Sequence, residues 1–222
     1  MRIASVLTPL SDYNLRLASQ CGVEDIVIRF PGLDYQHLIA LRDHIASFGL
    51  RVTVVEGYLP IENIKLGTPA RDEEIAQMKT LIRNMGAAGI PILCYNFMAG
   101  SDWTRTSFTE RERGGALVSG FDLDALNEKH ISPTLKVTSE QLWANLEYFL
   151  AQILPVAEES GVTLTMHPDD PPIPSLLGAA RIMHTVESFE RLMALAPSPH
   201  NAICFCQGTF AEMGVDIPAT IH

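Results

Sequence analysis

Apolar and polar residues follow two alternating periods along the chain, which predict strands and helices in turn. Runs rich in β-branched residues predict six strands, at residues 3–7, 24–30, 50–58, 90–97, 162–168 and 202–207. Apolar residues spaced three and four apart predict amphipathic helices between the strands, most clearly around residues 38–48, 71–86, 139–153 and 181–196. This alternation is typical of a parallel sheet wrapped by helices, so we expect an α/β fold.

One stretch interrupts the alternation. Residues 98–137 contain glycine, arginine and turn residues without a sustained period, and they predict a long loop. Loops of such length inside a compact domain are uncommon and are usually functional or mobile. The next helix should begin at a capping box of Thr138 and Gln141, and Pro155 is a position where that helix can kink.

Composition narrows the class of function. The 222 residues include 16 Lys and Arg against 26 Asp and Glu, a formal charge of −10. This balance argues against nucleic-acid binding, which depends on clustered cations. Hydrophobic residues make up 47% of the chain, enough for one sizeable core, and no apolar run is long enough to span a membrane. We expect a soluble globular protein.

The N-terminus and the cysteines indicate a compartment. The first apolar run is short and is closed by Pro9, unlike the longer apolar core of a signal peptide. The four cysteines, Cys21, Cys94, Cys204 and Cys206, are too few for a disulfide framework in a chain of this length. We therefore expect a cytoplasmic protein with reduced thiols, in which any thiol chemistry is catalytic or metal-binding.

Four polar side chains lie at predicted strand ends. In an α/β barrel the reacting groups sit at the carboxyl ends of the strands, on side chains that point inward. Successive strand residues point to opposite faces, so the apolar residues assign the helix side and leave the polar ones facing inward. The inward residues at the four ends are Glu56, Asn96, His167 and Cys206. We expect them to converge on one rim.

This set includes two candidate metal ligands. The imidazole of His167 and the thiolate of Cys206 are good donors for a divalent transition metal such as Zn, Mn or Fe. Two ligands do not complete a site, and Glu56, Asp169 and Asp170 are the nearest further candidates.

The same residues also have structural interpretations. A histidine beside a proline at a strand end is more often structural than a ligand, and a buried cysteine usually behaves as a small hydrophobe. Glu56 could pair with an arginine, and Asn96 could tie down a loop. In the long stretch, Asp102, Trp103 and Arg105 either form an ion pair with a packed aromatic or hold a carboxylated substrate.

Several short motifs of uncommon residues occur between about residue 50 and about residue 210. They are Ile64-Lys65-Leu66-Gly67 with Arg71-Asp72, Cys94-Tyr95-Asn96-Phe97-Met98, Asp102-Trp103-Thr104-Arg105-Thr106, His167-Pro168-Asp169-Asp170-Pro171-Pro172 and Cys206-Gln207-Gly208-Thr209. In this order they resemble the motifs of the mannonate dehydratases, metal-dependent lyases with a xylose-isomerase-like TIM barrel.

The resemblance implies a (β/α)8 TIM barrel of which this chain holds the first six βα units, as a single incomplete domain over residues 1–222. It implies that His167 and Cys206 bind Mn²⁺ or Fe²⁺. It places Asn96, Trp103 and Arg105 on the substrate side, to which the strand-end argument adds Glu56. The implied reaction converts the sugar acid D-mannonate to 2-dehydro-3-deoxy-D-gluconate in glucuronate catabolism.

Members of that family are longer. Their other two metal ligands, a histidine and an aspartate, and their acid and base lie beyond residue 222, so the resemblance assigns no catalytic residue here. Residues 216–222 look like the start of a helix cut short. Six strands leave two open sheet edges, so we expect a homo-oligomer. Two alternatives stay open: a sugar isomerase or epimerase on the same barrel, suggested by Glu56 and His167, and an inactive truncated fragment.

Overall fold

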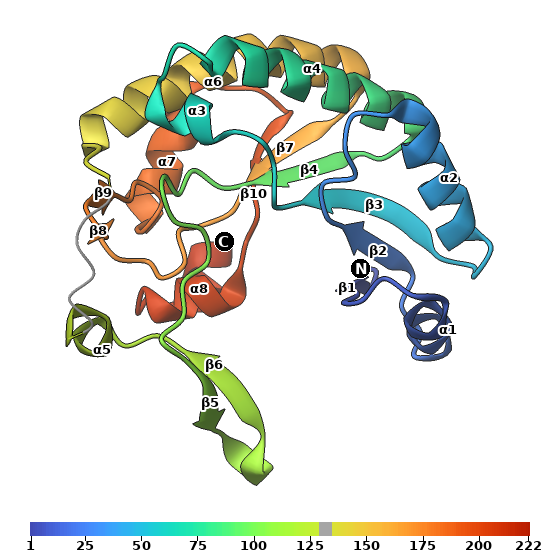
Figure 1. Ribbon diagram of the computed structural model, residues 1–222, viewed down its shortest axis with the longest axis horizontal. Coiled ribbons are helices and arrows are strands. Elements are labelled where there is room, and N and C mark those ends of the chain that lie inside the picture. Colours follow the sequence, from blue (N-terminus) through green and yellow to red (C-terminus); the bar gives the residue numbers. More distant parts are fainter. Residues whose placement is uncertain (129–134) are drawn as a thin grey trace.

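A computed structural model describes residues 1–128 and 135–222. Its centre is a six-stranded parallel sheet whose strands follow one another in chain order (Figure 1). The strands are β1 (Ala4–Val6), β2 (Asp25–Ile28), β3 (Arg51–Glu56), β4 (Ile92–Tyr95), β7 (Thr163–Met166) and β10 (Asn201–Ile203). The prediction of six strands is confirmed, and β1 and β10 form the two edges of this sheet within the described residues.

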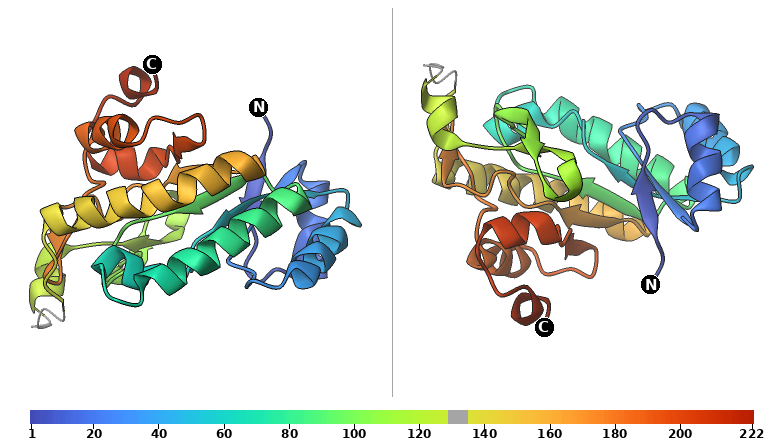
Figure 2. Two further views of the ribbon diagram at one scale, coloured as in Figure 1. Left: turned by 90° about the horizontal axis from the view of Figure 1, so that it is seen from above. Right: turned by 90° about the horizontal axis from the view of Figure 1, so that it is seen from below.

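Helices connect the strands and cover the outer side of the sheet. They are α1 (Asp12–Gln20), α2 (Tyr35–Ala46), α3 (Glu62–Leu66), α4 (Arg71–Ala88), α6 (Ser139–Ser160) and α7 (Val186–Leu195). Figure 2 shows α4 and α6 side by side over the sheet. Their buried faces pack against the apolar side of the strands, where Leu164 and Met166 of β7 are fully buried. The sheet is curved, and this packing leaves its polar side on the concave face, away from the helices (Figure 1).

The long stretch after β4 contains structure that its pattern does not predict. β5 (Ser107–Arg111) and β6 (Leu117–Gly120) form an antiparallel hairpin that projects from the body (Figure 1), and α5 (Leu123–Glu128) follows it. Almost every residue of the hairpin is exposed, so no alternation of buried and exposed positions marks it in the sequence. Residues 129–134 of the predicted loop lie outside the described residues.

Helix α6 begins where the sequence predicts and ends seven residues later than predicted, at Ser160. Thr138 and Gln141 form the capping box. The helix continues for 22 residues with Pro155 inside it, and it ends at Gly161, whose φ of 66° suits a residue without a side chain. The helix expected at residues 181–196 begins only at Val186, because a short hairpin of β8 (Ser175–Leu176) and β9 (Ala179–Ala180) precedes it.

The last predicted strand is wrong in its extent. It was expected at residues 202–207, but β10 ends at Ile203 and Cys206 is the N-cap of α8 (Gln207–Glu212). The chain turns there because Phe210 of α8 is buried and packs against Phe189 and Phe205. A final helix, α9 (Ile217–Ile221), follows. Among the described helices, none combines the length and the hydropathy that a membrane crossing requires.

Candidate functional site

A pocket of about 370 Å³ opens at the carboxyl ends of β2, β3, β4 and β7. Four of the six site residues assigned from the sequence line it: Glu56, Asn96, Trp103 and His167. Asp102 and Asp170, named above as further candidates, line it too. The strand register explains why they meet. Glu56 pairs with Cys94, and Cys94 pairs with Thr165, so these three positions share one face of the sheet. Asn96 and His167 each lie two residues further along the same face.

His167 is oriented by its own backbone neighbour. Its amide donates to the carbonyl of Tyr95 at 2.7 Å, which continues the β4–β7 ladder by one bond. Its Nδ1 lies 2.7 Å from the carbonyl oxygen of Pro168. A carbonyl only accepts, so Nδ1 carries a proton and Nε2 is the ring atom left for another partner.

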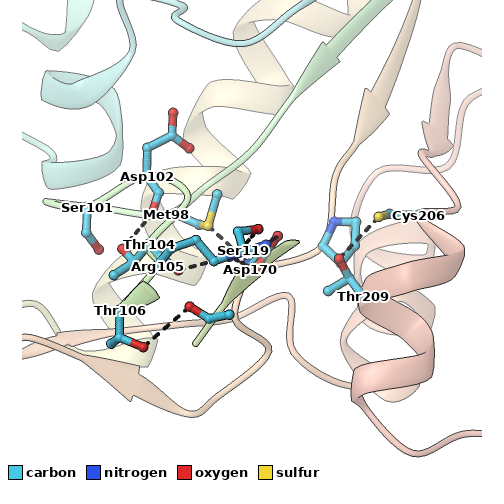
Figure 3. A network of polar contacts seen from close by, with 12 residues as sticks. Met98, Ser101, Asp102, Thr104, Arg105, Thr106, Ser119, Asp170, Cys206 and Thr209 are labelled. Atoms are coloured by element: carbon cyan, nitrogen blue, oxygen red, sulfur yellow. Dashed lines mark hydrogen bonds and ion pairs between the residues drawn. The ribbon is translucent and has the colours of Figure 1, made fainter. Parts of the chain in front are cut away.

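Cys206 is the other partner of the His167 ring. Thr209 Oγ1 donates to the Cys206 sulfur at 3.2 Å (Figure 3), and the Cys206 thiol lies close enough to the His167 ring to interact with it. The interaction with His167 lowers the pKa of Cys206 to about 7. Burial acts to lower the pKa of His167, but the Cys206 thiol, the charge of Cys204 and the Pro168 carbonyl together outweigh it and raise that pKa to about 9. Residues on two separate elements thus place a nitrogen and a sulfur donor in contact.

This pair fits a divalent metal as part of a coordination shell. A histidine whose far nitrogen donates to a carbonyl is the usual arrangement of a metal-binding imidazole. The described residues contain no group of three or more His, Cys, Asp or Glu side chains that could hold a metal. Asp169 and Asp170, considered above as further ligands, are bonded elsewhere: Asp169 Oδ2 accepts from the Met183 amide at 2.7 Å, and Asp170 binds an arginine.

Glu56 does pair with an arginine. Arg29 Nη1 donates to Glu56 Oε2 at 3.1 Å, and the guanidinium lies 5.6 Å from the ring centre of Tyr58. Arg29 and Tyr58 both line the pocket, and neither was predicted. Tyr58 has a φ of 55°, a conformation that few residues other than glycine adopt and that is often found at functional sites. Arg29 could have been found from the sequence, because it directly follows a β-branched run and therefore lies at the carboxyl end of a predicted strand.

Arg105 is held in a fork by Asp170. Its two terminal nitrogens donate to the two carboxylate oxygens at 2.6 and 2.8 Å (Figure 3). Its guanidinium carbon lies over the Trp103 ring, 4.3 Å from the ring centre. The ion pair with a packed aromatic is therefore what the structure contains, with Asp170 rather than Asp102 as the partner. Arg105 lies behind Trp103 and Asp170, which are the two members of this group that line the pocket.

Asn96 both ties down a loop and lines the pocket. Its Oδ1 accepts from the Met98 amide at 3.2 Å and from Lys65 Nζ at 3.1 Å, and its Nδ2 donates to Asp102 Oδ1 at 3.0 Å. Lys65 was not singled out by itself, although it lies within one of the motifs. The signal was a lysine between Ile64 and Leu66 on a short apolar segment.

Two of the remaining thiols, Cys94 and Cys204, interact with each other. Cys94 is buried and hydrogen-bonded to Cys204, which lowers the pKa of Cys204 and raises that of Cys94. Cys21 is exposed, and all four cysteines are free.

Comparison with known proteins points to one family. A family model described as D-mannonate dehydratase (UxuA) matches residues 12–135 and 128–222. A mannonate dehydratase from Streptococcus pneumoniae (strain 70585) is 38% identical over 201 residues, which cover 80% of this chain and 55% of the relative. The chain thus spans about half the length of that curated relative.

Solved structures agree with the sequence comparison. The crystal structure of mannonate dehydratase from Streptococcus suis serotype 2 superposes with a TM-score of 0.81 at 36% identity, covering 95% of this chain and 64% of that one. A D-psicose 3-epimerase superposes with a TM-score of 0.60 at 12% identity over 91% of this chain, a likeness of fold alone. The six parallel βα units are accordingly part of a TIM barrel of the xylose-isomerase-like type.

Proposed function

The chain belongs to the D-mannonate dehydratase (UxuA) family, and we propose that the gene product containing it removes water from D-mannonate to give 2-dehydro-3-deoxy-D-gluconate. The observation that carries the proposal is the contact of His167 with Cys206 beside a pocket that Glu56, Asn96 and Trp103 also line. We place the reaction in glucuronate catabolism and the protein in the cytoplasm, in line with its free cysteines.

His167 and Cys206 would hold a divalent metal, with Mn²⁺ or Fe²⁺ as our candidates. When bound, such a metal supplies Lewis-acid stabilisation of the negative charge that builds on the substrate carboxylate as the C2 proton leaves. The Pro168 carbonyl keeps the His167 ring in the tautomer that a ligand needs.

The other pocket residues bind and orient the sugar acid. Asn96 presents its amide N–H toward the hydroxyl groups, and Trp103 forms an apolar wall on the guanidinium of Arg105. Glu56, already paired with Arg29, can accept a hydrogen bond from a substrate hydroxyl. We assign the general acid and base to none of the described residues.

Turnover tests the proposal. The gene product that contains these 222 residues, supplied with Mn²⁺ and D-mannonate, should form a 2-keto acid lighter than the substrate by one water. Mass spectrometry of the product distinguishes this outcome from the alternative, since a sugar isomerase or epimerase leaves the mass of its substrate unchanged. No water loss under any divalent metal tried would reject the dehydratase function.

We also propose that the chain forms a homo-oligomer, because both edges of the sheet expose apolar side chains. Val6 is 37% exposed at β1, and Ile203 and Phe205 are 38% and 36% exposed at and beyond β10. Unpaired strand edges and exposed apolar patches favour association. The 222-residue chain purified alone should therefore elute as an oligomer in size-exclusion chromatography with light scattering. A monodisperse monomer that melts cooperatively would contradict this.

A further inference from the structure

Lys65 is a buried cation directly behind the pocket. It lies on α3 with 7% of its surface exposed, and burial lowers its pKa. Its ammonium donates to Asn96 Oδ1 at 3.1 Å and to the Met98 carbonyl at 3.0 Å, and Glu62 Oε2 lies 3.7 Å away. Two of its N–H groups thus have hydrogen-bond acceptors, and the Glu62 carboxylate is an ion-pair partner beyond hydrogen-bond distance. A buried charge is unfavourable without such partners, so burial ties the Lys65 ammonium to the Asn96 side chain and to the Met98 carbonyl.

The helix that carries Lys65 is fixed to the scaffold. Asn145 of α6 donates its Nδ2 to the Lys65 carbonyl at 2.9 Å. Glu74 of α4 accepts from the Ile64 amide at 3.0 Å. On the other side, Glu62 accepts from the Gly100 amide at 2.6 Å, which joins α3 to the loop after β4. Lys65 is therefore held relative to both long helices and to the loop that it contacts.

Lys65 is one of three groups that set which way the Asn96 amide faces. The oxygen and nitrogen of an asparagine side chain have nearly the same shape, so hydrogen bonds set the orientation. Two donors, Lys65 Nζ and the Met98 amide, meet the oxygen. The nitrogen must then face the opposite way, where one of its protons goes to Asp102. Its other proton is left for a ligand in the pocket.

We propose that Lys65 is a positioning residue that fixes Asn96 as a hydrogen-bond donor to an oxygen of the sugar acid. The inference rests on the proposed function, since it takes a polyhydroxy acid as the ligand of the pocket. The same bonds orient Asp102, which precedes the pocket residue Trp103. Lys65 thus sets the polarity of one wall of the pocket without touching the substrate itself.

The test replaces Lys65 by methionine, which keeps the length of the side chain and removes the charge. Lys79→Met is the matched control, because among the described residues Lys79 on α4 donates to Gln152 alone, at 3.1 Å, and it does not line the pocket. Lys65→Met should raise KM for D-mannonate about tenfold, the worth of one hydrogen bond to a charged or polar ligand, and change kcat less. Lys79→Met should leave both unchanged.

A double-mutant cycle separates positioning from a structural effect. If Lys65 acts through Asn96, then Lys65→Met in an Asn96→Ala background should add little to the rise in KM. Effects on KM that simply add, or a KM unchanged in Lys65→Met, would overturn the inference. Circular-dichroism melting of each variant controls for loss of the fold.

A second readout does not depend on turnover. The side-chain NH₂ resonances of Asn96, assigned in a ¹⁵N spectrum by their loss in Asn96→Ala, should shift in Lys65→Met and stay in place in Lys79→Met. An unchanged Asn96 signal in Lys65→Met would overturn the positioning role. If the wild-type protein does not dehydrate D-mannonate but the signal shifts as expected, the proposed function fails while the role of Lys65 in orienting Asn96 stands.

Discussion

The variants His167→Ala and Cys206→Ala are expected to lose D-mannonate dehydration by about a thousandfold or more. Each removes one of the two donors that meet beside the pocket. Lewis-acid stabilisation of developing charge supplies several kcal/mol, and each 1.36 kcal/mol corresponds to about tenfold in rate. Removal of a ligand also weakens metal binding, so both variants should purify with less metal than the wild-type protein.

The measurement combines steady-state kinetics with metal analysis by inductively coupled plasma mass spectrometry. Cys21→Ala is the matched control, because Cys21 is exposed at the end of α1 and remote from the pocket lining. It should keep both metal and activity. Stoichiometric metal in both His167→Ala and Cys206→Ala would refute the assignment of these residues as ligands.

The second large effect is expected on stability. Asp170→Asn should lower the free energy of unfolding by about 3–5 kcal/mol, because it leaves the guanidinium of Arg105 buried without its counter-charge. The side chains of Arg105 and Asp170 are only 11% and 12% exposed, and their contact is bidentate. Removing one partner of a buried ion pair is strongly destabilising, even where the intact pair itself adds little to the free energy of unfolding.

Chemical denaturation measures this difference. Asp43→Asn is the control, since Asp43 pairs with Arg42 at the surface with side-chain exposures of 60% and 34%. A pair so exposed contributes about 0–1 kcal/mol, so its loss should barely move the transition midpoint. Equal effects of the two substitutions would show that the Arg105–Asp170 fork does not stabilise the loop that carries Trp103.

The order of strands and helices could be predicted because each core element has one buried face. Leu164 and Met166 alternate with Thr163 and Thr165 on β7, and the same alternation places His167 on the inner side. The convergence of strand ends then follows from the geometry of a parallel sheet. For this reason four of the six predicted site residues line one pocket.

The partners of those residues could not be predicted. Arg105 and Asp170 are 65 positions apart, and Lys65 and Asn96 are 31 apart. The local pattern of apolar and polar residues does not indicate which polar side chains, far apart in sequence, contact each other in the fold. Tertiary packing also overrode the pattern at Cys206, where burial of Phe210 starts a helix in place of a continued strand. The exposed β5–β6 hairpin lacks the buried face on which such predictions depend.

We propose above that His167 and Cys206 together hold a divalent metal beside this pocket. The most direct measurement is the near-ultraviolet spectrum of the gene product reconstituted with Co²⁺, because a charge-transfer band there requires a bond between cobalt and a thiolate. We predict that the wild-type protein shows this band, that Cys21→Ala retains it and that Cys206→Ser abolishes it. A wild-type protein that binds Co²⁺ without the band, or a band that persists in Cys206→Ser, would contradict the claim.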